Sequence, residues 1–175
     1  MNGFFHVDRL MKLHEGEIIT LTKYDDIKPE ELQMHVNFLF PDGISCHGKK
    51  YIWSENKYLN NCTMVNSSEL IEYLFEYVRK SYYPQRPSRF KSIFAFDNFE
   101  EAKNFRNGYN NSIGNIWEVE ANNFFKADMN LLRLGNSLLE ADYNANLYWK
   151  GETIENPVWE YLLVPPVKVI RKVDG

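Results

Sequence analysis

The stretch that decides the fold is Val158-Trp-Glu-Tyr-Leu-Leu-Val-Pro-Pro166, followed directly by Val167 to Val173. The aromatic and aliphatic run from Trp159 to Val164 is typical of a β-strand. Pro165-Pro166 cannot donate to a strand ladder, so it separates this strand from the next one, over 167–173. The sequence therefore predicts that the chain ends in a pair of strands.

Outward from this pair, the chain mixes short strands with helices. Turn residues such as Gly16 bound further strands, which are predicted at 3–7, 17–22, 92–96, 115–120 and 124–127. Helices are predicted from near Pro29 to Asn37, at 67–83, at 98–107, and at 131–147 with an interruption near Gly135; 41–66 is predicted to be mostly loop. Because the order lacks a βαβ rhythm, the fold class is α+β with a largely antiparallel sheet.

The clearest helix opens at Ser67 and ends before Pro84, because its apolar residues recur on one face. The next helix has a sequence capping box, formed by Asp97 and Glu100, and Gly108 closes it. These signals are local, so they predict elements without saying how the elements pack.

Composition limits the class of protein. The 175 residues show no repeat or linker, so one domain over 1–175 is expected. Apolar residues make up 44% and charged residues 25%, which excludes a disordered chain. The net charge of −4 argues against a general nucleic-acid binder. Without an apolar run of about 18 residues or a signal peptide, we expect no membrane span and a cytoplasmic protein.

Common catalytic motifs are absent from the sequence. There is no GxxxxGK[ST], no GxGxxG and no GxSxG. Cys46, His47 and Cys62 could supply three metal ligands, but no CxxC or HxxxH pairing supports them. We therefore expect neither a metal site nor a disulfide framework.

Two basic features have both a structural and a functional interpretation. His6, on the first strand, is either a half-buried histidine bonded to the backbone or a hydrogen-bonding group on a cleft floor. The loop from Arg86 to Lys91 contains three cations, Arg86, Arg89 and Lys91. This loop is either solvated or a clamp for phosphate groups, which arginine binds well.

Among the carboxylates, Glu160 is the most informative. It begins an otherwise apolar strand, so it must lie at an edge, be paired, or face a cavity, because an unpaired buried charge is costly. In a cavity it could stabilise an oxocarbenium-like transition state. Glu118 and Glu120 share one face of a strand, and a solvent-facing sheet explains them as well as an acid/base pair does.

The order of three short motifs resembles the ADP-ribosyltransferase superfamily. These are Phe4-Phe5-His6, then Ser92-Ile-Phe-Ala-Phe96 followed by a helix, then Glu160-Tyr-Leu-Leu-Val-Pro-Pro-Val-Lys-Val169. The likeness is to the histidine-bearing branch, with the rifamycin-modifying transferases and the RNA 2′-phosphotransferases. It implies a compact fold in which two small antiparallel sheets, flanked by helices, form a cleft that binds NAD.

Roles follow from this resemblance for individual residues. His6 would contact the adenosine ribose of NAD, and Ser92, Phe94 and Phe96 would border the nicotinamide pocket. Glu160 would be the catalytic carboxylate, binding the nicotinamide-side ribose. Arg86 or Arg89 would reach the diphosphate, an assignment that comes from charge and not from a family motif.

The implied reaction cleaves the nicotinamide–ribose bond and transfers ADP-ribose to a protein, nucleic acid or small molecule. Phe94 and Phe96 replace the tyrosine of the His-Tyr-Glu subgroup, and Val158 replaces the Glu or Gln of arginine-modifying members, which argues against arginine as acceptor. Two other functions stay open. One is transfer of an RNA 2′-phosphate to NAD; the other is a non-catalytic interaction or sensor module with an aromatic patch formed by Tyr82, Tyr83, Tyr148 and Trp149.

Overall fold

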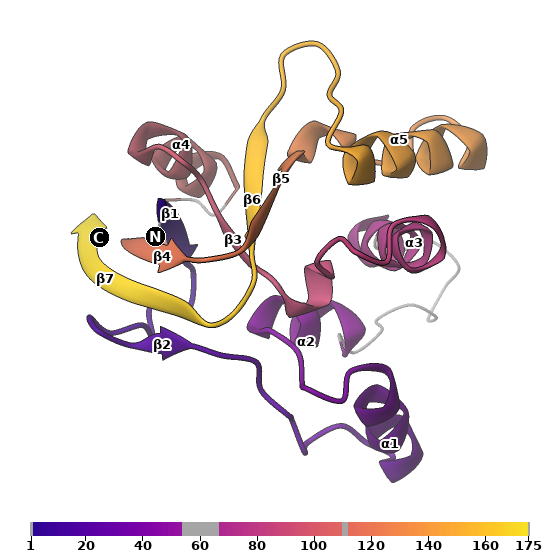
Figure 1. Cartoon of the computed structure of the whole chain (residues 1–175), viewed down its shortest axis with the longest axis horizontal. Helices are drawn as coiled ribbons and strands as arrows, with labels where there is room; N and C mark the ends of the chain where they lie inside the picture. The colour runs from indigo at the N-terminus through magenta and orange to yellow at the C-terminus, as the bar shows by residue number, and fades with distance from the viewer. Residues whose placement is uncertain (1, 54–66, 110–111, 175) are drawn as a thin grey trace.

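The computed structural model describes residues 2–53, 67–109 and 112–174, which fold into two antiparallel sheets flanked by helices (Figure 1). The larger sheet has the order β1-β4-β7-β2, with strands β1 (Asn2–Asp8), β4 (Asn115–Ala121), β7 (Val167–Asp174) and β2 (Ile18–Ile19). The smaller sheet has the order β3-β6-β5, with strands β3 (Ile93–Ala95), β6 (Trp159–Leu163) and β5 (Phe124–Asp128). The predicted α+β class and antiparallel pairing are confirmed.

Helices cover the smaller sheet and the outer ends of the fold. The α-helices are α1 (Glu30–Leu39), α2 (Cys46–Ile52), α3 (Ser67–Tyr82), α4 (Phe99–Tyr109) and α5 (Leu138–Lys150). Two short 3₁₀ helices, η1 (Arg89–Lys91) and η2 (Met129–Leu131), complete the described elements. Within the described ranges, no helix is both long and apolar enough to span a bilayer.

Strand β6 contributes to two separate hydrophobic cores, because its alternate side chains point to opposite faces of the smaller sheet. Tyr161 and Leu163 enter the core between the two sheets, where Phe4 and Trp117 meet them. Leu162 enters a second core, under α3 and α5. Since Glu160 has the same parity as Leu162, its carboxylate is directed to the helical side of the smaller sheet.

The two sheets are joined where β1 meets the edge of β3. The main chains of Phe5 and Phe96 exchange two hydrogen bonds of 2.8 and 2.9 Å. The next hydrogen-bonded pair of an antiparallel ladder would be Val7 with Phe94. His6 takes that place, because its Nδ1 donates to the Phe94 carbonyl oxygen at 2.7 Å.

The structure corrects several predicted boundaries. Helix α2 lies in the region predicted to be mostly loop; Ser45 caps it, accepting from the Gly48 amide and donating to the Phe90 carbonyl, both at 3.1 Å. The predicted strand over 17–22 is reduced to Ile18–Ile19, and the predicted helix over 131–147 is replaced by η2 and α5.

The predicted capping box before α4 is also wrong. Asn98 caps that helix, because its Oδ1 accepts from the Glu101 amide at 2.8 Å. Asp97 instead accepts a hydrogen bond of 2.6 Å from the Tyr161 hydroxyl, across to β6. The Asp97 carboxylate, which the local sequence pattern predicts as a helix cap, thus forms a hydrogen bond with a distant tyrosine instead.

The aromatic patch considered from the sequence is not a surface feature. Tyr148 and Trp149 are completely buried, and the indole of Trp149 donates to the Phe75 carbonyl at 2.7 Å. Tyr83 bonds Asn146 through its hydroxyl, and only Tyr82 is largely exposed. The helical period directs 148 and 149 inward, against α3 and β5.

Candidate functional site

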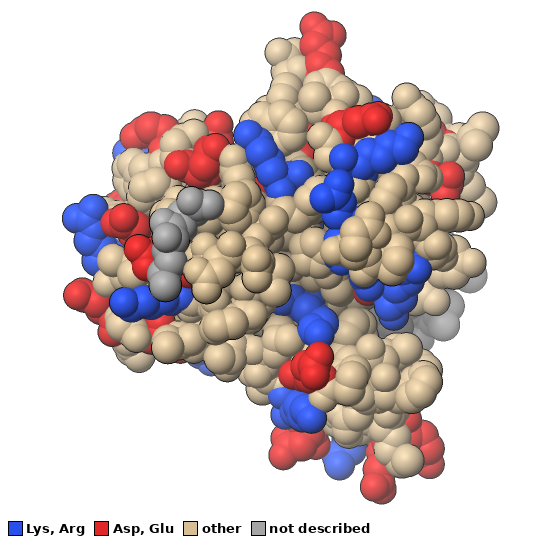
Figure 2. Space-filling view, in the orientation of Figure 1, with Lys and Arg blue, Asp and Glu red and all other residues tan. Residues whose placement is uncertain are grey.

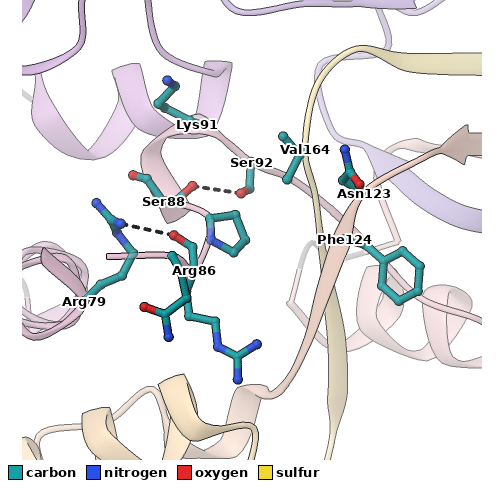
Figure 3. A pocket seen from close by; sticks show the side chains of 10 residues that line it. Arg79, Arg86, Ser88, Lys91, Ser92, Asn123, Phe124 and Val164 are labelled. Atoms are coloured by element: carbon teal, nitrogen blue, oxygen red, sulfur yellow. Dashed lines mark hydrogen bonds between the residues drawn. The ribbon is translucent and has the colours of Figure 1, made fainter. Parts of the chain in front are cut away.

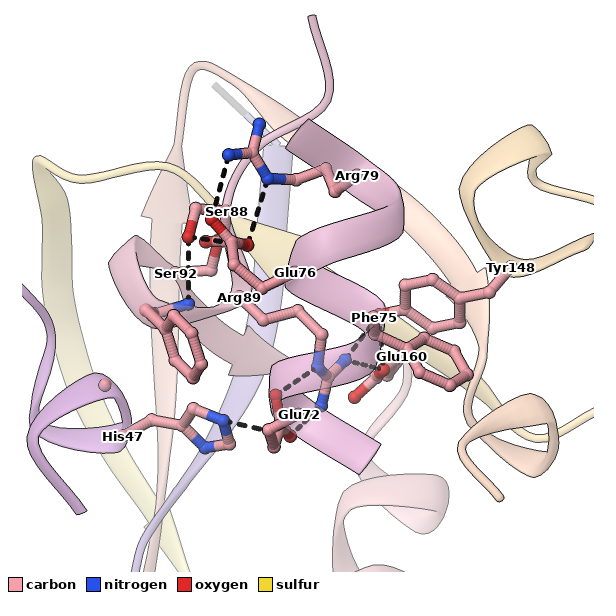
Figure 4. A network of polar contacts seen from close by, with 12 residues as sticks. His47, Glu72, Phe75, Glu76, Arg79, Ser88, Arg89, Ser92, Tyr148 and Glu160 are labelled. Atoms are coloured by element: carbon pink, nitrogen blue, oxygen red, sulfur yellow. Dashed lines mark hydrogen bonds and ion pairs between the residues drawn. The ribbon is translucent and has the colours of Figure 1, made fainter. Parts of the chain in front are cut away.

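Arg89 is the centre of a buried polar cluster on the helical side of the smaller sheet (Figure 4). It lies on η1 and is 3% exposed. Its Nε and one terminal nitrogen each bind Glu72 at 2.8 Å, in a bidentate pair. Its other terminal nitrogen bonds Glu160 and the Tyr148 hydroxyl.

Four elements bring this cluster together. Glu72 comes from α3, Arg89 from η1, Tyr148 from α5 and Glu160 from β6. The Tyr148 hydroxyl donates to the Glu160 carboxylate at 2.7 Å, so this acid is held by both a cation and a phenol. Of the three situations expected for Glu160, the structure has the paired one.

Burial and charge decide the protonation states in the cluster. Burial raises the pKa of Glu72, but the Arg89 guanidinium and His47 outweigh this and lower the pKa to about 2. Burial raises the pKa of Tyr148 well above its ordinary value, and the Glu160 charge adds to this against the opposing effect of Arg89. By formal charge, the carboxylates of Glu72 and Glu160 outnumber the one Arg89 guanidinium, and the raised pKa of Tyr148 keeps its phenol neutral at pH 7.

His47, on α2, is a further member that the sequence suggested only as a metal ligand. Its Nε2 lies 3.2 Å from a Glu72 oxygen, and its ring lies 4.4 Å from the Phe94 ring, centroid to centroid. Burial lowers the pKa of this imidazole, although the bond to Glu72 opposes the effect. Cys62, considered with His47 as a metal ligand, lies outside the described residues.

Phe94 connects His6 to this cluster. The Phe94 carbonyl oxygen accepts from His6, while the face of its ring lies 4.6 Å from the Arg89 guanidinium carbon. Arg89 in turn binds Glu160. A continuous series of contacts thus joins the opening, middle and closing motifs, through the main-chain carbonyl of Phe94 and side chains on β1, β3, η1 and β6.

The remaining predicted site residues lie elsewhere. Phe96 packs against Phe105 in a separate core, at a centroid distance of 5.1 Å. Ser92 is buried and donates to the Ser88 carbonyl at 2.8 Å. Arg86 donates to the Trp149 carbonyl at 3.0 Å. Arg86 and Ser92 both line a pocket of about 550 Å³ whose lining does not include Phe94 (Figure 3).

Sequence reasoning missed Glu72 and Tyr148 as members of the site. Glu72 lies within the apolar stripe of α3, between Ile71 and Phe75, and Glu76 follows one turn later. A carboxylate on the apolar face of a helix needs a buried partner. The position of Glu72 in this stripe could therefore have identified it as a member of a buried polar cluster. Tyr148 gave no comparable signal, because a tyrosine on an apolar helix face is ordinary core.

The fold and the site define an α+β protein with two antiparallel sheets and a buried carboxylate–arginine cluster on the helical side of the smaller sheet. The chain belongs to the family described as Protein of unknown function (DUF2441), whose model matches residues 4–175. No curated protein matches the sequence.

Proposed function

We propose that the protein binds NAD at the junction of β1 and β3 and cleaves the nicotinamide–ribose bond, transferring ADP-ribose to an acceptor. The observation that supports this function is the contact series from His6 through Phe94 and Arg89 to Glu160. The three motifs whose order resembles the ADP-ribosyltransferases are thereby linked through Phe94, whose carbonyl oxygen accepts from His6 and whose ring faces the Arg89 that binds Glu160.

The charge of the cluster fits the chemistry of this reaction. When the glycosidic bond breaks, its electron pair leaves with neutral nicotinamide and the ribose becomes an oxocarbenium-like cation. The excess negative charge of Glu72, Arg89 and Glu160 favours positive charge that develops nearby, above all where water is excluded. A lone pair of the acceptor then forms the new bond to the ribose carbon, and the acceptor loses a proton.

Individual residues have distinct roles in this proposal. Phe94 offers an aromatic ring to the nicotinamide, and His6 offers its second ring nitrogen as a polar contact to a ribose. Glu160 acts as the catalytic carboxylate, and Tyr148 and Arg89 hold it in place. Arg89 itself is engaged by two carboxylates, so we do not assign it to the diphosphate.

Turnover of NAD tests the proposal. The wild-type protein is incubated with NAD labelled in the nicotinamide ring, and free nicotinamide is separated by chromatography. We expect release by the wild type, and a loss of about 100-fold or more in Glu160→Gln, which keeps the shape of the side chain and removes its charge. Glu152→Gln, at an exposed position, is the matched control and keeps full activity.

Binding and folding measurements complete this test. Calorimetry with NAD is expected to show saturable binding that His6→Phe weakens, while circular dichroism confirms that the variants are folded. A wild-type protein that neither binds NAD nor releases nicotinamide refutes the function. Full turnover by Glu160→Gln refutes the role given to that carboxylate.

A further inference from the structure

A pocket of about 550 Å³ lies beside the buried cluster, at the end of the smaller sheet (Figure 3). The C-terminal part of α3, the loop before η1, the turn into β5 and the end of β6 form its walls. Its lining residues are Arg79, Gln85, Arg86, Pro87, Ser88, Lys91, Ser92, Asn123, Phe124 and Val164.

The lining is cationic in a protein that is acidic overall. Arg79, Arg86 and Lys91 contribute three positive charges and the lining contains no carboxylate, whereas the net charge of the chain is −4. In Figure 2, Lys and Arg side chains gather near the middle of the face, where α3, α5 and β5 come together in Figure 1. Arg79 is paired with Glu76 and Lys91 with Asp42, so Arg86 supplies the charge in this lining that is left to attract an anion.

One wall of the pocket is built by buried hydrogen bonds. Arg79 binds Glu76 through two nitrogens, at 2.8 and 3.0 Å, and donates to the Arg86 carbonyl at 3.1 Å. Ser88 donates to Glu76 at 3.0 Å, and Ser92 donates to the Ser88 carbonyl. These contacts hold the loop in one shape, so a ligand would meet a preformed wall.

Arg86 keeps an unneutralised charge on this wall. Its Nε and one terminal nitrogen donate to the carbonyls of Trp149 and Lys150, and its guanidinium carbon lies 4.4 Å from the centre of the Phe125 ring. In the described part of the chain, no carboxylate pairs with it. Neutral partners thus fix the side chain and leave donors for an anion.

Other groups of the lining can complete an anion site. Among the described residues, the side-chain amides of Gln85 and Asn123 have no hydrogen-bond partner. Lys91 binds Asp42 at 3.0 Å, but the side chains are 33% and 73% exposed, so this surface pair is weak and can be exchanged for a ligand.

We propose that this pocket binds the phosphate or diphosphate group of a small phosphorylated molecule. Arg86 is the main anion contact, the amides of Gln85 and Asn123 are further donors, and Lys91 adds charge. The volume suits a nucleotide-sized ligand, and the position beside the carboxylate cluster suits either NAD or a second phosphorylated substrate. The inference does not depend on NAD cleavage.

Inorganic pyrophosphate is the probe, measured by isothermal titration calorimetry at low ionic strength. We expect saturable binding that Arg86→Gln weakens about tenfold or more, as the loss of a charge-assisted hydrogen bond predicts. Asn123→Ala weakens it less, and serves as a second variant if Arg86→Gln unfolds. Arg171→Gln, an exposed arginine outside the pocket, binds like the wild type.

A competition experiment with NAD then distinguishes the two candidate ligands, NAD itself and a second phosphorylated substrate. Competition between NAD and pyrophosphate, with both lost in Arg86→Gln, supports the pocket as the place of the NAD diphosphate. Independent binding of NAD supports it as the site of a second phosphorylated ligand. The proposal is overturned if the wild type shows no saturable pyrophosphate binding, if Arg86→Gln and Arg171→Gln behave alike, or if only RNA binds and pyrophosphate fails to displace it.

Discussion

His6 and Phe94, 88 positions apart in the chain, are joined by a 2.7 Å hydrogen bond from the imidazole Nδ1 to a main-chain carbonyl oxygen. A side chain here replaces the amide that would continue the ladder between β1 and β3. The bond also fixes the tautomer, because Nδ1 must carry the proton and Nε2 is left as an acceptor. The His6 ring is therefore a polar group of defined orientation at the junction of the two sheets.

Acid is expected to destabilise the protein through two partly buried histidines, His6 and His47. Burial lowers the pKa of both His6 and His47 below 6.5, although bonds to Phe94 and Glu72 oppose this. Below pH 6.5 the unfolded chain therefore binds more protons than the folded one, and the free energy of unfolding falls as the pH drops. Urea unfolding between pH 7.5 and 5 should show this slope.

The double variant His6→Gln/His47→Gln should flatten the slope, because glutamine keeps a donor and does not titrate. His14→Gln, at an exposed position, should leave the slope as in the wild type. An unchanged slope in the double variant would contradict the assignment of the pH dependence to these two imidazoles.

Removing the guanidinium from the cluster should cost more stability than any surface pair. Arg89→Met leaves Glu72 and Glu160 buried without their cation, and breaking a buried pair in this way costs about 3–5 kcal/mol. Arg171→Met removes the exposed partner of Glu118 and should cost about 0–1 kcal/mol. Urea unfolding at pH 7 measures both.

The Arg89→Met defect should also shrink at pH 4, because Arg89 is the main group that lowers the pKa of Glu72, and without it this buried carboxyl can take up a proton. A loss of stability that is equal at pH 7 and pH 4 would show that packing, and not charge, explains the effect.

Glu72 should make the protein sensitive to strong acid. Burial raises its pKa, but Arg89 and His47 outweigh this and lower it from 4.5 to about 2. Its contribution is therefore present above pH 4.5 and lost as the pH falls toward 2, and a shift of this size corresponds to roughly 3 kcal/mol. Glu72→Gln should lack this part of the acid transition, whereas Glu15→Gln, at an exposed position, should retain it.

Two helical glycines should respond in opposite directions to alanine. A Cβ at Gly48 would lie 2.2 Å from the Phe90 carbonyl oxygen, so Gly48→Ala must push α2 away from η1, at a cost of about 1–3 kcal/mol. A Cβ at Gly108 would meet nothing within 4 Å, so Gly108→Ala should raise stability by up to about 1 kcal/mol. Thermal unfolding of both variants gives the comparison, and a neutral Gly48→Ala would contradict the close approach.

Much of the fold could be predicted because its signals are local. The run from Trp159 to Leu163 and the apolar stripe of α3 each identify an element without reference to distant residues. Helix α2 was missed because it is short and because its cap, Ser45, is held in place by a hydrogen bond to the carbonyl of Phe90, which is distant in the sequence. The Asp97 cap failed because Tyr161 takes the carboxylate.

The candidate site was predicted in part. Glu160 could be recognised as a carboxylate that must lie at an edge, be paired or face a cavity, since its strand is otherwise apolar. Its partner could not be chosen, because Arg86 and Arg89 are both cations of the same loop. The fold buries Arg89 between two acids and leaves Arg86 in the adjoining pocket.

The sequence by itself determined most strands and helices, the α+β class, and that the acid at position 160 must lie at an edge, be paired or face a cavity, because period and composition act over a few neighbouring residues. Only the tertiary structure decided that Glu72, Arg89, Tyr148 and Glu160 meet. The partners in an ion pair or a side-chain hydrogen bond can lie any number of residues apart in the sequence. These interactions gain strength where packing removes water from around them.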